Sequence, residues 1–371
     1  MRARCLGGLL LWCAASASAE PQWFVVAIDG AKVGHATMQR DTRDDSVVDT
    51  THIELELQGA DRPNRIVLDQ RFASRRDGTP LAYALSLRTH DVARGKTATV
   101  DGDAIALDID EQGIARHERV ALPPGVTWPL AEAALLRDAI GQPGRTLALT
   151  GFDTSDDAAV PVELAIGEKR AIDVAGRSVV ATAVVRTVRN GDAASTTTSW
   201  LDDDLRPLRV QMRVAGVALD LDAATRDAAL APNRPVDFIK RLFVRSPYRI
   251  PPSAQAQRIR YVLAHADGVF DVPATGEQRV RVDGDAVTLD VCATCGDAPR
   301  VDVVPPETLA PNARIESDAP EFADAVRKVG TIADRRRLML ALEDHARRSL
   351  VGINGFLGAG SALAAARSGQ G

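Results

Sequence analysis

The heptapeptide Thr51-His52-Ile53-Glu54-Leu55-Glu56-Leu57 alternates strictly between polar and apolar residues. In an extended strand, successive side chains point to opposite faces of a sheet, so this period of two predicts a β-strand with one buried face. The buried face would carry Ile53, Leu55 and Leu57. The solvent face would carry His52, Glu54 and Glu56.

Similar patterns flank this strand on both sides. Trp23–Ile28 predicts a strand, Asp29-Gly30 a tight turn, and Val33–Met38 a returning strand. Leu81–Leu87 is a further candidate strand, and Val100–Ala104 is placed at the tip of a hairpin. Residues 23 to about 120 are therefore predicted to form an antiparallel β-meander.

Residues 129–140 interrupt the pattern, because Pro129 is followed by apolar residues at helical spacing. Strand patterns resume from Thr146 to Leu221. An antiparallel sheet interrupted by one helix suits a half-barrel or a sandwich. We expect residues 20–225 to form this N-terminal antiparallel β-domain.

A second, smaller β-unit is expected over residues 235–305. Pro232 and Pro235 mark its boundary, and Arg279–Val291 predicts a hairpin around Asp283-Gly284. After this unit the sequence becomes helical. Asp318 is expected to cap a helix with Pro320 in its first turn, and Asp334 is expected to cap the next. In that second helix, one apolar stripe is expected, formed by Met339, Leu342, Ala346 and Leu350. Residues 310–371 are expected to be the helical start of an incomplete core, so the predicted fold class is α+β.

The first 19 residues read as a cleaved signal peptide. Arg2 and Arg4 give a positive start, Leu6–Trp12 gives a short apolar stretch, and Ala17-Ser18-Ala19 offers a cleavage site after Ala19. No later segment is apolar and long enough to cross a membrane. We therefore expect a periplasmic protein.

Composition and charge exclude one large class of partner. Of the 371 residues, 45% are hydrophobic and 26% charged, which is ordinary for a globular protein, and the net charge is −5. Binding to a phosphate backbone needs a basic surface, so no nucleic-acid partner is expected.

Cys292 and Cys295 are the cysteines that remain after signal removal, and they allow three interpretations. A redox pair normally lies at a helix N-terminus, whereas here a strand precedes it. A zinc site would need two more ligands. A structural disulfide across a tight loop suits an oxidising compartment best.

The other candidate motifs have simpler interpretations. His52-Ile53-Glu54 with Cys292 and Cys295 resembles a zinc deaminase signature, but Val291 stands where that signature has proline, so a solvated sheet face is favoured. Gly358-Ala359-Gly360 lacks the third glycine of a dinucleotide loop. Asp202-Asp203-Asp204 are interpreted as turn acids, and His345 as a surface or packing residue of a helix. No metal site and no cofactor are predicted.

Several segments in the second half of the chain resemble bacterial exported transglutaminase-like proteins of the cysteine protease superfamily. The segments are Trp200–Asp203 with Pro207–Val210, Phe243–Pro247, Arg258–Tyr261 with Val272–Gln278, Ala319–Val329, Arg335–Val351 and Ser361–Gly371. The last of these resembles the stretch that leads into the nucleophilic cysteine of that family.

This resemblance implies thiol-dependent amide hydrolysis or acyl transfer on a protein or peptide substrate, without a cofactor. It also implies that the chain is truncated just before the catalytic cysteine, so no catalytic residue can be assigned and the chain is expected to be inactive as given. The alternative is a non-catalytic periplasmic β-rich binding or assembly module. A redox protein using Cys292 and Cys295 is a third, disfavoured interpretation.

Overall fold

The computed structural model describes most of the chain from residue 20 onward. The described ranges are 20–43, 45–58, 63–89, 93–111, 114–155, 157–190, 193–214, 217–234, 236–237, 248–255, 257–264, 272, 274–284, 286–292, 306–312, 315–350 and 362–369. The chain divides into two compact units, one of Met1–Leu242 with Ala313–Gly371 and one of Phe243–Asn312. The predicted signal peptide, with its cleavage site at Ala19, lies outside the described residues.

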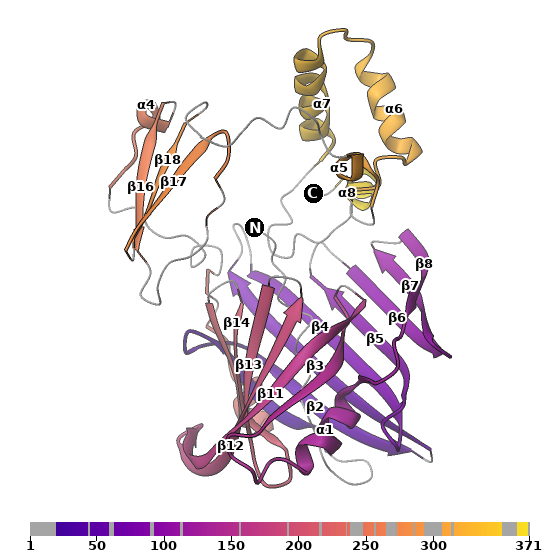
Figure 1. The fold of residues 1–371 in the computed structure, drawn as a ribbon, viewed down its shortest axis with the longest axis vertical. Coiled ribbons are helices and arrows are strands. Elements are labelled where there is room, and N and C mark those ends of the chain that lie inside the picture. Colours follow the sequence, from indigo (N-terminus) through magenta and orange to yellow (C-terminus); the bar gives the residue numbers. More distant parts are fainter. Residues whose placement is uncertain are drawn as a thin grey trace. The chain divides into compact units, whose positions relative to one another are not determined.

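One 15-stranded sheet dominates the first unit (Figure 1). We call strands β1–β8 the first arm and strands β9–β15 the second arm. The first arm comprises β1 (Gln22–Ile28), β2 (Ala31–Arg43), β3 (Ser46–Gln58), β4 (Pro63–Arg75), β5 (Pro80–Arg88), β6 (Ala93–Asp101), β7 (Ala104–Glu111) and β8 (Ile114–Ala121). The second comprises β9 (Val126–Thr127), β10 (Thr146–Asp153), β11 (Ala158–Val174), β12 (Arg177–Asn190), β13 (Ala193–Leu201), β14 (Pro207–Val214) and β15 (Val217–Ala224).

The two arms are meanders that meet where β1 pairs with β15. The strand order runs from β8 down to β1, then from β15 down to β9, so β8 and β9 lie at opposite edges. Neighbouring strands pair antiparallel, except that β9 pairs parallel with β10. The alternation that predicted a strand at residues 51–57 is confirmed, because that stretch lies within β3.

A short connection requires this sheet to curl. Only residues 122–125 join β8 to β9, and such a link spans at most about 18 Å. Fifteen strands laid flat would measure about 65 Å across, at about 4.8 Å per strand. The two arms must therefore fold over one another, as Figure 1 shows for the magenta strands of the second arm in front of the purple strands of the first.

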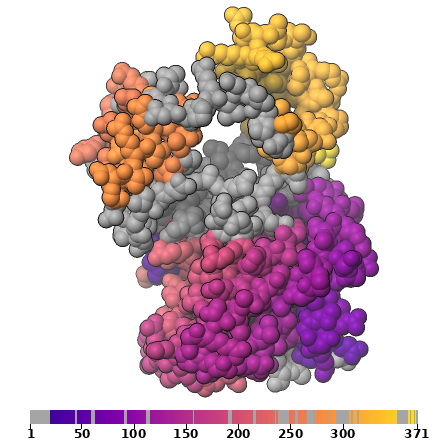
Figure 2. All heavy atoms as spheres, in the orientation of Figure 1, coloured from indigo at the N-terminus to yellow at the C-terminus, as the bar shows by residue number. Residues whose placement is uncertain are grey.

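The space between the arms is filled by apolar side chains. One cluster gathers around β1–β4, β14 and β15 and includes Phe24, Met38 and Leu221. A second joins residues of both arms, because Phe72 of β4 and Tyr83 of β5 pack with Trp128 and with Phe152 of β10. In Figure 2 the atoms of the two arms adjoin closely along the visible side.

A polar clamp accompanies this aromatic contact. Asp157, in the turn between β10 and β11, accepts hydrogen bonds from the hydroxyl of Tyr83 and from Nζ of Lys96 in β6. Lys96 Nζ also donates to the backbone oxygen of Thr154, at 2.9 Å. Burial, and then the neighbouring Asp157 carboxylate, raises the pKa of Tyr83, so this hydroxyl stays neutral and acts as the donor.

Helix α1 (Pro129–Arg137) lies between the arms and confirms the predicted helix at Pro129 (Figure 1). Ala133 and Leu136 pack against apolar residues of β11 and β12. Glu132, fully buried in the same helix, accepts two hydrogen bonds from Arg186 of β12, at 3.1 and 3.2 Å. This bidentate geometry satisfies both charges away from water.

The other elements are shorter. The second unit carries a three-stranded antiparallel sheet of β16 (Ile259–Ala264), β18 (Ala286–Val291) and β17 (Gln278–Asp283), in that order. The remaining helices in the part of the chain that the structure describes are α2 (Arg226–Leu230), α4 (Pro252–Gln255), α5 (Pro306–Leu309), α6 (Pro320–Val329), α7 (Arg335–Ser349) and α8 (Ala362–Ser368). Asp334 caps α7 as predicted. The predicted cap of α6 at Asp318 is wrong, because the N-cap residue is Ala319, which makes no side-chain hydrogen bond to the helix.

The predicted α+β fold class is wrong. Strands account for 58% of the structure and helices for 17%, so the fold is predominantly β. Helices α6 and α7 were expected to begin a transglutaminase-like core, but neither contains a buried residue. Met339, in the predicted apolar stripe of α7, is 61% exposed. The principal core lies in the curled sheet. The predicted domain boundaries stay predictions.

We expect the clamp at Asp157 to stabilise the closed arrangement of the arms. Replacing Asp157→Asn removes the negative charge that faces Lys96, whose side chain is 12% exposed, and should cost about 2–3 kcal/mol. The matched control is Asp203→Asn, because the Lys169–Asp203 pair is exposed and should cost under about 1 kcal/mol. Urea unfolding measures both, and equal losses in the two variants would contradict the clamp.

The buried pair of Glu132 and Arg186 gives a second prediction. Glu132→Leu leaves the Arg186 charge buried alone and should lower the unfolding free energy by about 3–5 kcal/mol. Combining it with Arg186→Met removes that charge and should recover most of the loss. Urea unfolding of the two single variants and the double variant tests this. Strictly additive losses would show that the two residues do not depend on each other.

Candidate metal centre and neighbouring trough

Polar side chains form a row across the outer face of the first arm. Residues paired directly across two strands share one face of a sheet. His35 of β2 pairs with Glu54 of β3, and His52 of β3 pairs with Asp69 of β4. Ile53, between His52 and Glu54, points to the opposite face and belongs to the core. This register places His35, His52, Glu54 and Asp69 together on the outer face.

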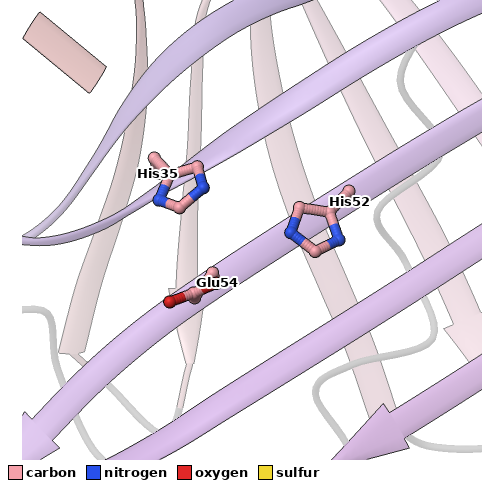
Figure 3. A group of neighbouring side chains, drawn as sticks. All are labelled: His35, His52 and Glu54. Carbon is pink, nitrogen blue, oxygen red and sulfur yellow. The ribbon is translucent and has the colours of Figure 1, made fainter. Parts of the chain in front are cut away.

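The ligand atoms of His35, His52 and Glu54 all lie within 4.8 Å of one another. Figure 3 shows the three side chains grouped on two neighbouring strands. All three residues are half-buried. Two imidazoles and one carboxylate are a ligand set that zinc and other divalent transition metals accept, so the cluster is a candidate metal centre.

Asp69 orients the ring of His52. Its Oδ1 lies 2.6 Å from His52 Nδ1, and its Oδ2 accepts a hydrogen bond of 2.8 Å from Arg88. An ionised carboxylate only accepts hydrogen bonds, so Nδ1 of His52 carries the proton. In the neutral ring, Nε2 then keeps its lone pair.

Glu54 has a competing partner in Arg65. The guanidinium donates two hydrogen bonds to the carboxylate, at 2.7 and 2.6 Å. These hydrogen bonds are the main cause that lowers the pKa of Glu54, so its carboxylate is ionised at neutral pH. The side chain of Arg65 is 67% exposed, which makes the pair easy to exchange for another partner.

His35 is held by aromatic packing. Its ring stacks on Trp23 of β1 with centroids 5.9 Å apart, and the guanidinium of Arg226 in α2 lies 5.8 Å from the Trp23 ring. Burial is the largest cause that lowers the pKa of His35, so the neutral imidazole is favoured. Among the described residues, none forms a hydrogen bond with the His35 side chain.

Gly34 allows β2 to approach β3 closely at this point. A Cβ atom at position 34 would lie 1.9 Å from the backbone oxygen of Glu54. Only glycine fits such an approach. The residue before His35 therefore helps set the distance between His35 and Glu54.

A depression of about 530 Å³ lies beside this cluster and crosses strands β3–β8. We call it the trough. One of its cross-strand rows is Asp69, Ser86, Gly95 and Asp110, and the next is Arg71, Ala84, Thr97, Asp108 and His117. The depression arises because β5 and β6 carry small outer residues between the longer ones of β4 and β7.

The other predicted site residues lie elsewhere or outside the described residues. Cys292 is disulfide-bonded, but Cys295 is not described, so their pairing stays a prediction. In the Asp202–Asp204 turn, Asp202 Oδ1 accepts from the backbone N–H groups of Asp204 and Arg206, at 3.0 and 2.8 Å. His345 lies half-buried on α7. Gly358-Ala359-Gly360 lies outside the described residues.

His35 is the residue that the sequence did not single out. His52 and Glu54 were correctly placed on a polar strand face, but no metal site was predicted there. The signal that could have found His35 is its place in the returning strand beside residues 51–57. Using that signal requires the exact β2–β3 register, which the sequence pattern leaves open.

No protein-family model matches the chain, and no curated protein matches it. Solved structures similar to it include a β-barrel-like protein of domain of unknown function DUF1849 from Brucella abortus, with 10% identity and a TM-score of 0.44, covering 55% of this chain and 95% of that one. A DUF1089 family protein from Pseudomonas aeruginosa has 12% identity and a TM-score of 0.25, covering 56% and 95%. At these TM-scores neither resemblance gives the chain a family or a function.

The expected membership of the transglutaminase-like cysteine protease superfamily is wrong. The structure is mostly β-sheet with few helices, and the helices α6 and α7, which were expected to begin the core of that family, contain no buried residue. Weak similarities of short segments, in both strands and helices, produced that expectation. Among the described helices, none is both long and apolar enough to span a membrane.

The hydrogen bonds from Arg65 to Glu54 give a prediction for the centre itself. Replacing Arg65→Gln should raise the pKa of Glu54 towards its ordinary value, because the charged donor is the main cause of the lowering. Titration of the Glu54 carboxylate by carbon-13 NMR measures this. An unchanged Glu54 pKa would show that Arg65 does not hold the carboxylate.

Proposed function

We propose that this protein is a non-catalytic β-rich binding module and that the trough is its ligand site. The observation that supports the proposal is the depression of about 530 Å³ over β3–β8, with small residues at its centre and charged residues around it. Pockets for small ligands have volumes of roughly 300–1,000 Å³. The trough has the size for a small molecule.

The scaffold beneath the trough suits binding. The residues lie on hydrogen-bonded strands, and β4–β7 each pair with a neighbour on both sides. A site built on such strands is already formed before the ligand arrives, so less ordering is required on binding.

The charges around the trough indicate the chemistry of the ligand. Arg71 lines the same depression as Asp69, Asp108 and Asp110, so both signs of charge border it. The His117–Asp108 pair has side chains 80% and 70% exposed, and such a pair exchanges partners at little cost. We propose a small zwitterionic ligand, of which free amino acids and dipeptides are the simplest examples.

We also propose that the protein acts in the periplasm. The support is the predicted signal sequence of residues 1–19, with cleavage after Ala19. A ligand of the proposed kind would then be met outside the cytoplasm.

Filling the trough should abolish ligand binding without harming the fold. At Gly95, a Cβ atom would have no other atom within 4 Å, so Gly95→Trp places its ring in the open depression. Thermal unfolding with a panel of amino acids and dipeptides measures binding. A ligand at 100 times its Kd should stabilise the wild type by about 2.7 kcal/mol and leave Gly95→Trp unchanged.

The matched control is Gly141→Trp. Gly141 also has open space around its Cβ position, but it follows helix α1 and does not line the trough. This control should respond to the panel as the wild type does. The proposal fails if no compound stabilises the wild type, or if the compounds stabilise Gly95→Trp equally.

A further inference from the structure

We propose that His35, His52 and Glu54 bind a divalent transition-metal ion, with zinc as the simplest case. The three side chains would supply two nitrogen ligands and one oxygen ligand, and a fourth position would stay open to water. This inference goes beyond the trough and does not depend on it.

The ligand atoms of the three side chains lie almost close enough together to coordinate one metal ion. These atoms lie within 4.8 Å of one another. A tetrahedral ion with bonds of about 2.0–2.1 Å requires ligand atoms about 3.4 Å apart, so the distances between the ligand atoms must shorten by up to about 1.4 Å. The backbone already fixes their positions, because His35 pairs directly with Glu54 and His52 precedes Glu54 by two residues on the same face.

The surroundings of His52 support ligation. A metal-binding histidine almost always donates its second ring N–H to a carboxylate, a backbone carbonyl or a water. Asp69 accepts that hydrogen bond at 2.6 Å, and Arg88 holds Asp69 from the other side at 2.8 Å. The chain Arg88–Asp69–His52 thus fixes the tautomer and orientation that a metal ligand needs.

The other two side chains are placed so that an ion can reach them. The ring of His35 stacks on Trp23 and forms no hydrogen bond with any described residue. Arg65 occupies the carboxylate of Glu54 in this structure, but its side chain is 67% exposed and can turn into solvent. The ion would therefore compete with Arg65 for Glu54, and this competition gives the inference a specific test.

The test is titration of the full chain with ZnCl₂, followed by isothermal calorimetry. His35→Gln and His52→Gln should each weaken zinc binding by more than about 100-fold, and Asp69→Asn by about 10- to 100-fold. Arg65→Gln should tighten zinc binding several-fold, because Glu54 no longer has to release a cation.

The matched control is His117→Gln. Nδ1 of His117 also lies 2.5 Å from an aspartate, Asp108, but His117 is not part of the cluster, so this variant should bind zinc as the wild type does. Thermal unfolding without zinc checks that each variant is folded. Absorption of the Co²⁺-loaded wild type in the visible range should show the strong bands of a four-coordinate ion.

Three results would overturn the inference. The first is an absence of zinc binding to the wild type. The second is equal zinc affinity in the wild type and the two histidine variants. The third is weaker zinc binding in Arg65→Gln than in the wild type. None of these results bears on ligand binding in the trough, and loss of dipeptide binding in Gly95→Trp would not bear on zinc. The two proposals therefore fail separately.

Discussion

The short connection between β8 and β9 is the constraint on which the rest of this structure depends. It joins the two edge strands of a 15-stranded sheet through residues 122–125, so the sheet has to curl until its arms face each other. The contact between the arms is then made by Phe72, Tyr83, Trp128 and Phe152 and is completed by the polar clamp at Asp157. Hydrophobic burial supplies the driving force. The clamp pairs Asp157 with Tyr83 and Lys96, so these three side chains keep hydrogen bonds where closure removes them from water.

Closure also decides where function can lie. The inner face is occupied by three apolar clusters, by helix α1 and by the Glu132–Arg186 pair. The side chains of this interior pack against one another and leave little space for a ligand. The side chains that we propose to bind an ion and a small molecule are on the outer face of the first arm. There the cross-strand row from His35 to Asp69 adjoins the trough, and Asp69 belongs to both.

Local sequence patterns predicted the parts of this fold that depend on residues close together in the sequence. The alternation at residues 51–57 correctly placed Ile53 inside and His52 with Glu54 outside, and Pro129 correctly marked the start of α1. The candidate metal centre could not be predicted in the same way, because it depends on the pairing of His35 with Glu54 between two strands. The trough depends on the pairing of Ser86 with Gly95 for the same reason. Register comes from the whole sheet, and no single segment specifies it.

The C-terminal helices show why segment similarity gave the wrong family. An apolar stripe through Met339 and Leu342 is typical of a helix that packs on a core, yet Met339 is 61% exposed and α7 has no buried residue. Such a stripe shows which face of a helix can be buried. It does not show whether the rest of the chain forms a surface on which that face can pack. In this chain the buried apolar clusters lie in the curled sheet and against helix α1.

The central claim is that the outer face of the first arm is the functional surface, and anomalous X-ray diffraction at the zinc edge tests it most directly. Crystals of the protein grown with ZnCl₂ should show an anomalous peak between His35, His52 and Glu54, with bonds of about 2.0–2.2 Å to all three side chains. The Arg65 side chain should have turned away from Glu54. A well-occupied zinc ion elsewhere on the chain, with Arg65 still bound to Glu54 and no peak at the two histidines, would contradict the claim.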